Sequence, residues 1–147
     1  MTVVPRDSLE RLATRHNKPV HATARETSTN AVLALRNAYR QEMNCQIVHD
    51  SIHRRTGWTR TYALAVDEIN AGFGSMAIGG PWTGNPTIFE FYVLSAYRGC
   101  AFQLFERFLE ASGARLMEIQ SNDALLAVML HTTRATSEVK RSSFATA

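Results

Sequence analysis

Apolar and polar residues alternate from Val20 to Arg25, a period of two that predicts a β-strand. The polar cluster 27–30 then offers side chains that cap helices, and over 32–43 apolar residues recur every three or four positions. The segment 47–56 continues as a second helix, which Gly57 ends. The first part of the chain therefore predicts one strand followed by two helices.

The middle of the chain carries three further strands in succession. They are rich in β-branched and aromatic residues and lie at 62–66, 73–78 and 88–94, joined by a turn at 67–72 and a Gly- and Pro-rich loop at 79–86. Glu90 is the lone carboxylate in the third strand. Three strands without a helix between them indicate a mixed sheet rather than a doubly wound parallel one.

The remaining pattern predicts a helix, a strand and a helix. These elements are a largely buried helix at 101–111 ended by Gly113, a strand at 116–120, and a helix at 123–134 capped by Asn122. The complete order predicts a mixed α/β (α+β) fold in one domain, residues 19–147, after an N-terminal extension of residues 1–18. The polar tail contains one weak strand, 137–144.

The length and composition are those of a single folded domain. The chain has 147 residues, 45% of them hydrophobic and 20% charged, which argues against intrinsic disorder. Its longest apolar stretch, 124–130, is far shorter than the roughly 20 residues of a membrane span, so we expect no membrane partner. Since no secretion signal is recognisable, we expect Cys45 and Cys100 to be reduced thiols in a cytoplasmic protein.

Charge is distributed unevenly along the chain. Residues 1–60 hold ten Arg and Lys against five Asp and Glu, whereas residues 61–133 hold three against seven. A basic first half favours an anionic partner such as a phosphate-bearing cofactor or acceptor. Because it has no basic run longer than Arg54-Arg55 and no aromatic residues interleaved with its charges, we do not expect nucleic-acid binding.

The joint between the strand 88–94 and the helix 101–111 is the first candidate for chemistry. Such a joint directs unpaired backbone amides and the positive end of the helix dipole at one spot, which phosphate commonly occupies. Gly99 lets a ligand approach the backbone, and Arg98 can reach a phosphate oxygen. An ordinary tight connection has the same pattern, so the residues alone leave both interpretations open.

Residues 91–103, Phe-Tyr-Val-Leu-Ser-Ala-Tyr-Arg-Gly-Cys-Ala-Phe-Gln, resemble the acetyl-CoA signature of the GNAT superfamily of N-acetyltransferases. The stretch 116–130 is similar to the strand, Asn and helix that follow in that family. The resemblance implies a GNAT-like acyl-CoA N-acyltransferase fold, a mixed central sheet flanked by helices, with acetyl-CoA as acyl donor. The cofactor contacts that it implies are Phe91, Tyr92, Val93, Arg98, Gly99, Cys100, Ala101, Phe102, Gln103 and Asn122.

The sequence departs from the family pattern in two places. In the phosphate loop, Ala101 and Gln103 stand where small residues, the first a glycine, are usual. After Arg134 the chain has room for one more strand at most, so we expect the last one or two strands of the fold to be missing. The uncovered edge would favour a homodimer. The alternative to an active enzyme is a catalytically inactive remnant of the fold that binds CoA or a protein partner.

The family resemblance implies direct transfer of the acetyl group to a primary amine acceptor in a ternary complex. Such a reaction needs a base for the ammonium, a donor for the carbonyl oxygen and an acid for the thiolate. We assign the base to Glu90, whose pKa partial burial would raise, and the acid to His131. The donor would be a backbone N–H near Val93 or Leu94. A Glu90 that pairs with an arginine or faces solvent, and a surface His131, are the structural alternatives.

Cys45, His49 and His53 are spaced four residues apart, on one face of a predicted helix. Thiolate and imidazole are zinc ligands, but the two ends of this series lie too far apart for one ion and no fourth ligand is evident, so we expect no metal. We expect His49 and His53 to line the acceptor site instead. Trp82, in the loop 79–86, offers a stacking surface at the border of the same cleft.

Overall fold

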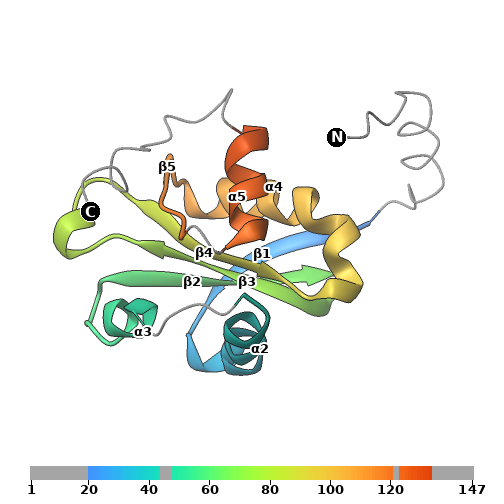
Figure 1. Cartoon of the computed structure of the whole chain (residues 1–147), viewed down its shortest axis with the longest axis horizontal. Helices are drawn as coiled ribbons and strands as arrows, with labels where there is room; N and C mark the ends of the chain where they lie inside the picture. Colours follow the sequence, from blue (N-terminus) through green and yellow to red (C-terminus); the bar gives the residue numbers. More distant parts are fainter. Residues whose placement is uncertain (1–19, 44–47, 121–122, 134–147) are drawn as a thin grey trace.

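The computed structural model describes residues 20–43, 48–120 and 123–133. At its centre is a five-stranded sheet in the order β1-β2-β3-β4-β5 (Figure 1). The strands are β1 (Ala22–Thr27), β2 (Thr59–Val66), β3 (Ile69–Ala77), β4 (Thr87–Val93) and β5 (Leu116–Met117). The first four pair antiparallel and β5 runs parallel to β4, so the mixed sheet that the sequence predicts is confirmed.

Helices cover both faces of this sheet. They are α2 (Leu33–Met43), α3 (Val48–His53), α4 (Ala101–Ser112) and α5 (Ala124–Thr133), with 3-10 segments η1 (Asn30–Val32), η2 (Gly80–Trp82) and η3 (Ser95–Cys100). In Figure 1, α2 and α3 lie below the sheet and α4 and α5 above it. None of the helices in the described ranges is long and apolar enough to cross a membrane.

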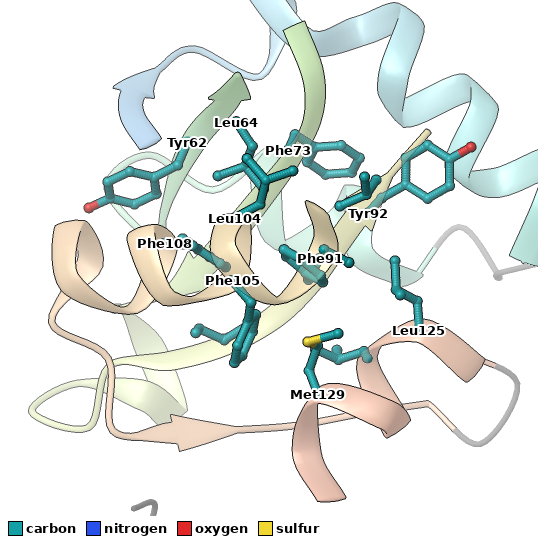
Figure 2. Close-up of a cluster of buried hydrophobic side chains, with 14 of the residues drawn as sticks. Tyr62, Leu64, Phe73, Phe91, Tyr92, Leu104, Phe105, Phe108, Leu125 and Met129 are labelled. Carbon is teal, nitrogen blue, oxygen red and sulfur yellow. The ribbon is translucent and has the colours of Figure 1, made fainter. Parts of the chain in front are cut away.

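An aromatic core fills the space between the sheet and α4 (Figure 2). Phe91 of β4 packs edge-on against Phe105, with ring centroids 4.9 Å apart, and stacks on Phe108 at 6.3 Å. These rings are fully buried and supply much of the apolar contact between the two layers. Because side chains alternate along a strand, Phe91 on this face directs Glu90 and Tyr92 to the opposite face, toward α2 and α3.

The hairpin between β2 and β3 is tighter than the sequence indicated. The predicted turn, 67–72, is wrong in extent, because Ile69 already pairs with Val66 and only Asp67 and Glu68 form the turn. Both turn residues have positive φ, 49° and 69°, as a two-residue hairpin turn of type I′ requires. The Asp67 carboxylate accepts a hydrogen bond from the backbone N–H of His21 at 3.1 Å, which anchors the turn to the start of β1.

Four sequence predictions fall on residues outside the described ranges. They concern the N-terminal extension 1–18, the tail strand 137–144, the cap residue Asn122 and the thiol of Cys45. The predicted strand 116–120 is present, but its paired part is limited to the two residues of β5.

Candidate active site

A β-bulge in the middle of β4 places the carboxylate of Glu90. The register between β3 and β4 shifts after Ser75, which faces Glu90, and leaves Phe89 without a partner on β3. A bulge re-aims the side chains beside it. The ring of Phe89 accordingly packs against both histidine rings of α3, with centroids 5.1 and 5.2 Å away. Glu90 is only 2% exposed.

His49 and His53 hold the Glu90 carboxylate between them. His53 Nε2 lies 2.5 Å from Glu90 Oε1, and His49 Nδ1 lies 3.3 Å from Oε2. The second nitrogen of each ring also has a partner: His53 Nδ1 is 2.9 Å from Thr59 Oγ1, and His49 Nε2 is 3.2 Å from the amide nitrogen of Gln120. The spacing of four residues between His49 and His53 therefore brings both imidazoles to the Glu90 carboxylate.

The pKa of Glu90 lies well below its usual range. Burial raises it, but the hydrogen bonds and charge interactions with His49 and His53 together outweigh burial and lower it. The expectation that burial would raise this pKa is therefore wrong, because the histidine partners were not visible in the sequence. Glu90 is therefore ionised near neutral pH and, with its lowered pKa, is a weak base.

A second group of charged side chains lies on the side of the site that faces α2. Arg36, of which 7% is exposed, donates from Nη2 to Asp50 Oδ1 at 2.7 Å, and Arg40 pairs with the same oxygen. Arg36 Nη2 also lies 4.0 Å from Glu90 Oε2. Asp50 therefore neutralises two arginines of α2. These pairings could not be predicted from the sequence, since they join different elements.

β4 and β5 pair over only two residues, which leaves an opening in the hydrogen-bonded ladder on that side of β4, and Val93 at its far end is fully buried. The N–H of Leu94 donates to the carbonyl of Ala71 on β3 at 2.8 Å. Because backbone groups alternate along an antiparallel strand, the N–H and C=O of Val93 point the other way, toward the opening. Of the two amides proposed as donors, only that of Val93 faces it. His49 and Gln120 meet across the same opening on the α3 side.

The connection from β4 to α4 folds as the 3-10 segment η3, and its polar groups are bonded within the chain. The guanidinium of Arg98 donates to the Val93 carbonyl at 3.2 and 2.7 Å and to Glu42 Oε1 at 2.5 Å. The N–H of Ala101 donates to the carbonyl of Arg98. The sequence predicted that both groups would be open to a phosphate, whereas in this structure each has a partner.

The other residues of this connection are accessible. Phe102, 51% exposed, and Gln103 lie on the first turn of α4, and Cys100 is half-buried. A Cβ atom added at Gly99 would meet nothing within 4 Å. The start of α4 is therefore open to a ligand, although its first amide is already bonded.

Four predicted cofactor contacts are buried instead: Phe91, Tyr92, Val93 and Ala101 are each at most 3% exposed. Phe91 is buried in the aromatic core, and Tyr92 is 2% exposed on the face toward α2. The hydroxyl of Tyr92 donates to Glu42 Oε2 at 2.6 Å. Burial and the Glu42 carboxylate raise the pKa of Tyr92 to about 12, while hydrogen bonds from Arg98 and Tyr92 lower the pKa of Glu42.

The structure separates His131 from the Glu90 cluster and places Trp82 against Glu118. His131 is exposed in the last turn of α5, on the opposite face of the sheet from α3 (Figure 1). Trp82 donates from its indole nitrogen to Glu118 Oε1 at 3.1 Å. Glu118 and Gln120 were missed, although their spacing of two on a predicted strand places them on one face. Among the described residues, no three His, Cys, Asp or Glu side chains are grouped as metal ligands.

Comparison with known proteins identifies the fold. No family model matches the sequence, and no curated protein matches it. A ribosomal-protein-alanine N-acetyltransferase from Brucella melitensis biovar Abortus 2308 superposes with a TM-score of 0.51 at 12% identity, covering 76% of this chain and 90% of that one. The GNAT-like fold expected from the sequence is therefore confirmed.

Two other solved structures are similar at lower TM-scores. A GNAT-family acetyltransferase from Streptococcus pneumoniae TIGR4 has a TM-score of 0.47 and 13% identity, covering 79% of this chain and 86% of its own. The aminoglycoside acetyltransferase AAC(6')-Iy, in complex with a bisubstrate analogue, has a TM-score of 0.45 and 18% identity, covering 78% and 88%.

Proposed function

Because the chain has the fold of GNAT N-acetyltransferases, we propose that it transfers an acetyl group from acetyl-CoA to a primary amine. The observation that carries the proposal is the buried Glu90–His49 pair beside the opening between β4 and β5. A carboxylate that holds one nitrogen of an imidazole leaves the other nitrogen to accept a proton. A base at this opening is what the attack of an amine on a thioester requires.

In the proposed reaction, His49 replaces Glu90 as the base. The Nδ1–H of His49 donates to Glu90, and Nε2 takes a proton from the acceptor ammonium in place of the Gln120 amide. Glu90 then stabilises the imidazolium. The free amine nitrogen then attacks the thioester carbon, and the carbon–sulfur bond breaks. The second proton of the nitrogen passes to the departing thiolate, so that the products are the amide and the CoA thiol.

The residues around the opening suit acetyl-CoA in part. The thioester is the activated acyl group, and the Val93 N–H is the backbone donor that faces the opening where its carbonyl oxygen would lie. The open start of α4 at Gly99 and Gln103 can receive the phosphates.

The bonds of Arg98 favour a second candidate, an inactive module that binds a protein partner. Its guanidinium is bonded to Glu42 and Val93, and it leaves fewer free donors for pyrophosphate than the sequence implied. The two candidates differ in one measurable property, the affinity for acetyl-CoA.

Calorimetric titration of the purified protein with acetyl-CoA, with CoA alongside, distinguishes them. Binding at micromolar concentrations supports the transferase, and its absence up to millimolar concentrations supports the second candidate. Release of the CoA thiol with a panel of primary amines then measures turnover.

The catalytic role is tested by His49→Gln, with His21→Gln as the matched control. His21 is exposed, and both of its hydrogen bonds to Asp67 use its backbone atoms. We expect His49→Gln to lower kcat by about 100-fold or more while leaving acetyl-CoA affinity within about threefold, because a general base contributes 10²–10⁴-fold. His131→Ala tests the residue first suggested as acid. Turnover that survives His49→Gln would contradict the assignment of the base.

A further inference from the structure

One half-buried carboxylate beside the site lacks a cation. Glu118 accepts a hydrogen bond from the indole N–H of Trp82 at Oε1, and among the described residues no Lys, Arg or His pairs with it. The carboxylates nearer α2 differ in this respect. Glu42 is paired with Arg98, and Asp50 with two arginines. A carboxylate held in place without a counter-charge is suited to bind a cation from outside.

Glu118 lies close to the proposed base. It is two positions before Gln120, whose side-chain amide lies 3.2 Å from His49 Nε2. Two residues of extended chain span at most about 7 Å. Gln120 makes its contact with α3, and an even spacing on an extended segment places two side chains on one face. A molecule with two cationic groups can therefore reach His49 and Glu118 at once.

Aromatic rings form the wall beside Glu118. Trp82 is half-exposed and packs edge-on against Trp58, with ring centroids 6.3 Å apart. A Cβ at Gly79 or Gly80 would collide with the Trp58 ring, so close backbone packing fixes this wall. Glu118 accepts from the N–H at the edge of the Trp82 ring, and the face of an indole ring also attracts an ammonium group.

Of the basic residues near the site, those of α2 are paired with a carboxylate. Arg36 and Arg40 share the Asp50 carboxylate, and Arg55 lies over the ring of Trp58 at 4.5 Å. The positive charge of the first half of the chain, which favoured an anionic acceptor on the sequence alone, is thus partly neutralised inside the protein.

We propose that Glu118 and Trp82 form a subsite for a second ammonium group of the acceptor, so that the preferred substrates are diamines and longer polyamines. One ammonium binds to Glu118, and the other gives its proton to His49 before attack. This inference rests on the proposed acetyl transfer and adds the class of acceptor. It does not change the reaction.

The kinetic test compares 1,4-diaminobutane and 1,5-diaminopentane with butylamine and pentylamine as acceptors. We expect kcat/KM for the diamines to exceed that for the monoamines by about tenfold or more, the equivalent of about 1.4 kcal/mol. Glu118→Gln should bring this ratio close to one. Glu106→Gln, an exposed carboxylate on α4, should leave the ratio unchanged. Equal rates for both kinds of amine in the unmodified protein would overturn the proposal.

A binding experiment separates this proposal from the proposed reaction. The protein saturated with CoA is titrated calorimetrically with 1,5-diaminopentane, alongside its Glu118→Gln and Glu106→Gln variants. Binding that Glu118→Gln weakens tenfold or more, without turnover of any amine, would support the cation site and contradict acetyl transfer. Binding that is absent, or that both variants weaken equally, would refute the cation site whether or not amines are acetylated.

Discussion

Replacing Glu90 by glutamine removes the negative charge from the buried cluster while keeping the size of the side chain. Glu90 accepts hydrogen bonds from two imidazoles and is 2% exposed. A glutamine can accept from one histidine only, and its amide group then presents hydrogens to the other. Hydrogen bonds to a charged group contribute about 1.5–3 kcal/mol each. We therefore expect Glu90→Gln to lower the free energy of unfolding at pH 7 by about 2–3 kcal/mol.

The pH dependence of the unfolding free energy tests this prediction most directly. The pKa of Glu90 in the folded protein lies below its ordinary value of 4.5. Such a group stabilises the fold above its unfolded pKa, and the stabilisation is lost as the pH falls below that value toward the folded pKa. The difference in unfolding free energy between the unmodified protein and Glu90→Gln should therefore shrink as the pH falls from 5 toward 3.

Urea unfolding followed by the fluorescence of the two tryptophans measures both effects. Glu106→Gln, on the exposed side of α4, is the control and should change the unfolding free energy by less than about 0.5 kcal/mol. A Glu90→Gln protein as stable as the control at pH 7 would refute the reasoning. So would a stability difference that stays constant as the pH falls.

Two further predictions concern the packing of the sheet and its tyrosine. A Cβ at Gly72 would meet the carbonyl oxygen of Tyr92 on the neighbouring strand, so Gly72→Ala should lower the free energy of unfolding by about 2 kcal/mol or more. Gly99 has open space around it, and Gly99→Ala should change the free energy of unfolding by less than about 0.5 kcal/mol. Thermal melts of both variants measure the difference. Tyr92 should titrate with a pKa of about 12 in the folded protein, measured as the difference in phenolate absorbance between the unmodified protein and Tyr92→Phe. The stabilisation of the fold by the neutral Tyr92 should be lost as the pH rises from about 10 to 12. Titration of Tyr92 near 10 would contradict its bond to Glu42.

Most elements of the fold could be predicted from local pattern because their apolar residues follow one period. The strand at 88–94 and the helix at 101–111 agree with β4 and α4 to within a residue. The turn at 67–72 could not be predicted correctly, since Asp67 and Glu68 adopt positive φ without a glycine to signal it. Tertiary pairing overrode local preference there.

The sequence predicted individual residues of the candidate site but not the contacts between them. The lone carboxylate of Glu90 and the spacing of His49 and His53 drew attention to the right residues. Their meeting depends on the bulge at Phe89 and on the docking of α3, which no local pattern encodes. Gln120 joins them because β5 runs beside β4, a neighbourhood set by the whole chain.

The two-residue pairing between β4 and β5 also affects how the protein behaves at high concentration. A strand with free backbone groups along one side is a template for a strand from another molecule, the first step toward aggregation. The carbonyl of Val93 faces that side, and the guanidinium of Arg98 covers it with two hydrogen bonds. Arg98 thus hinders intermolecular strand pairing at this edge. This role restricts which residues can replace Arg98, independently of any ligand.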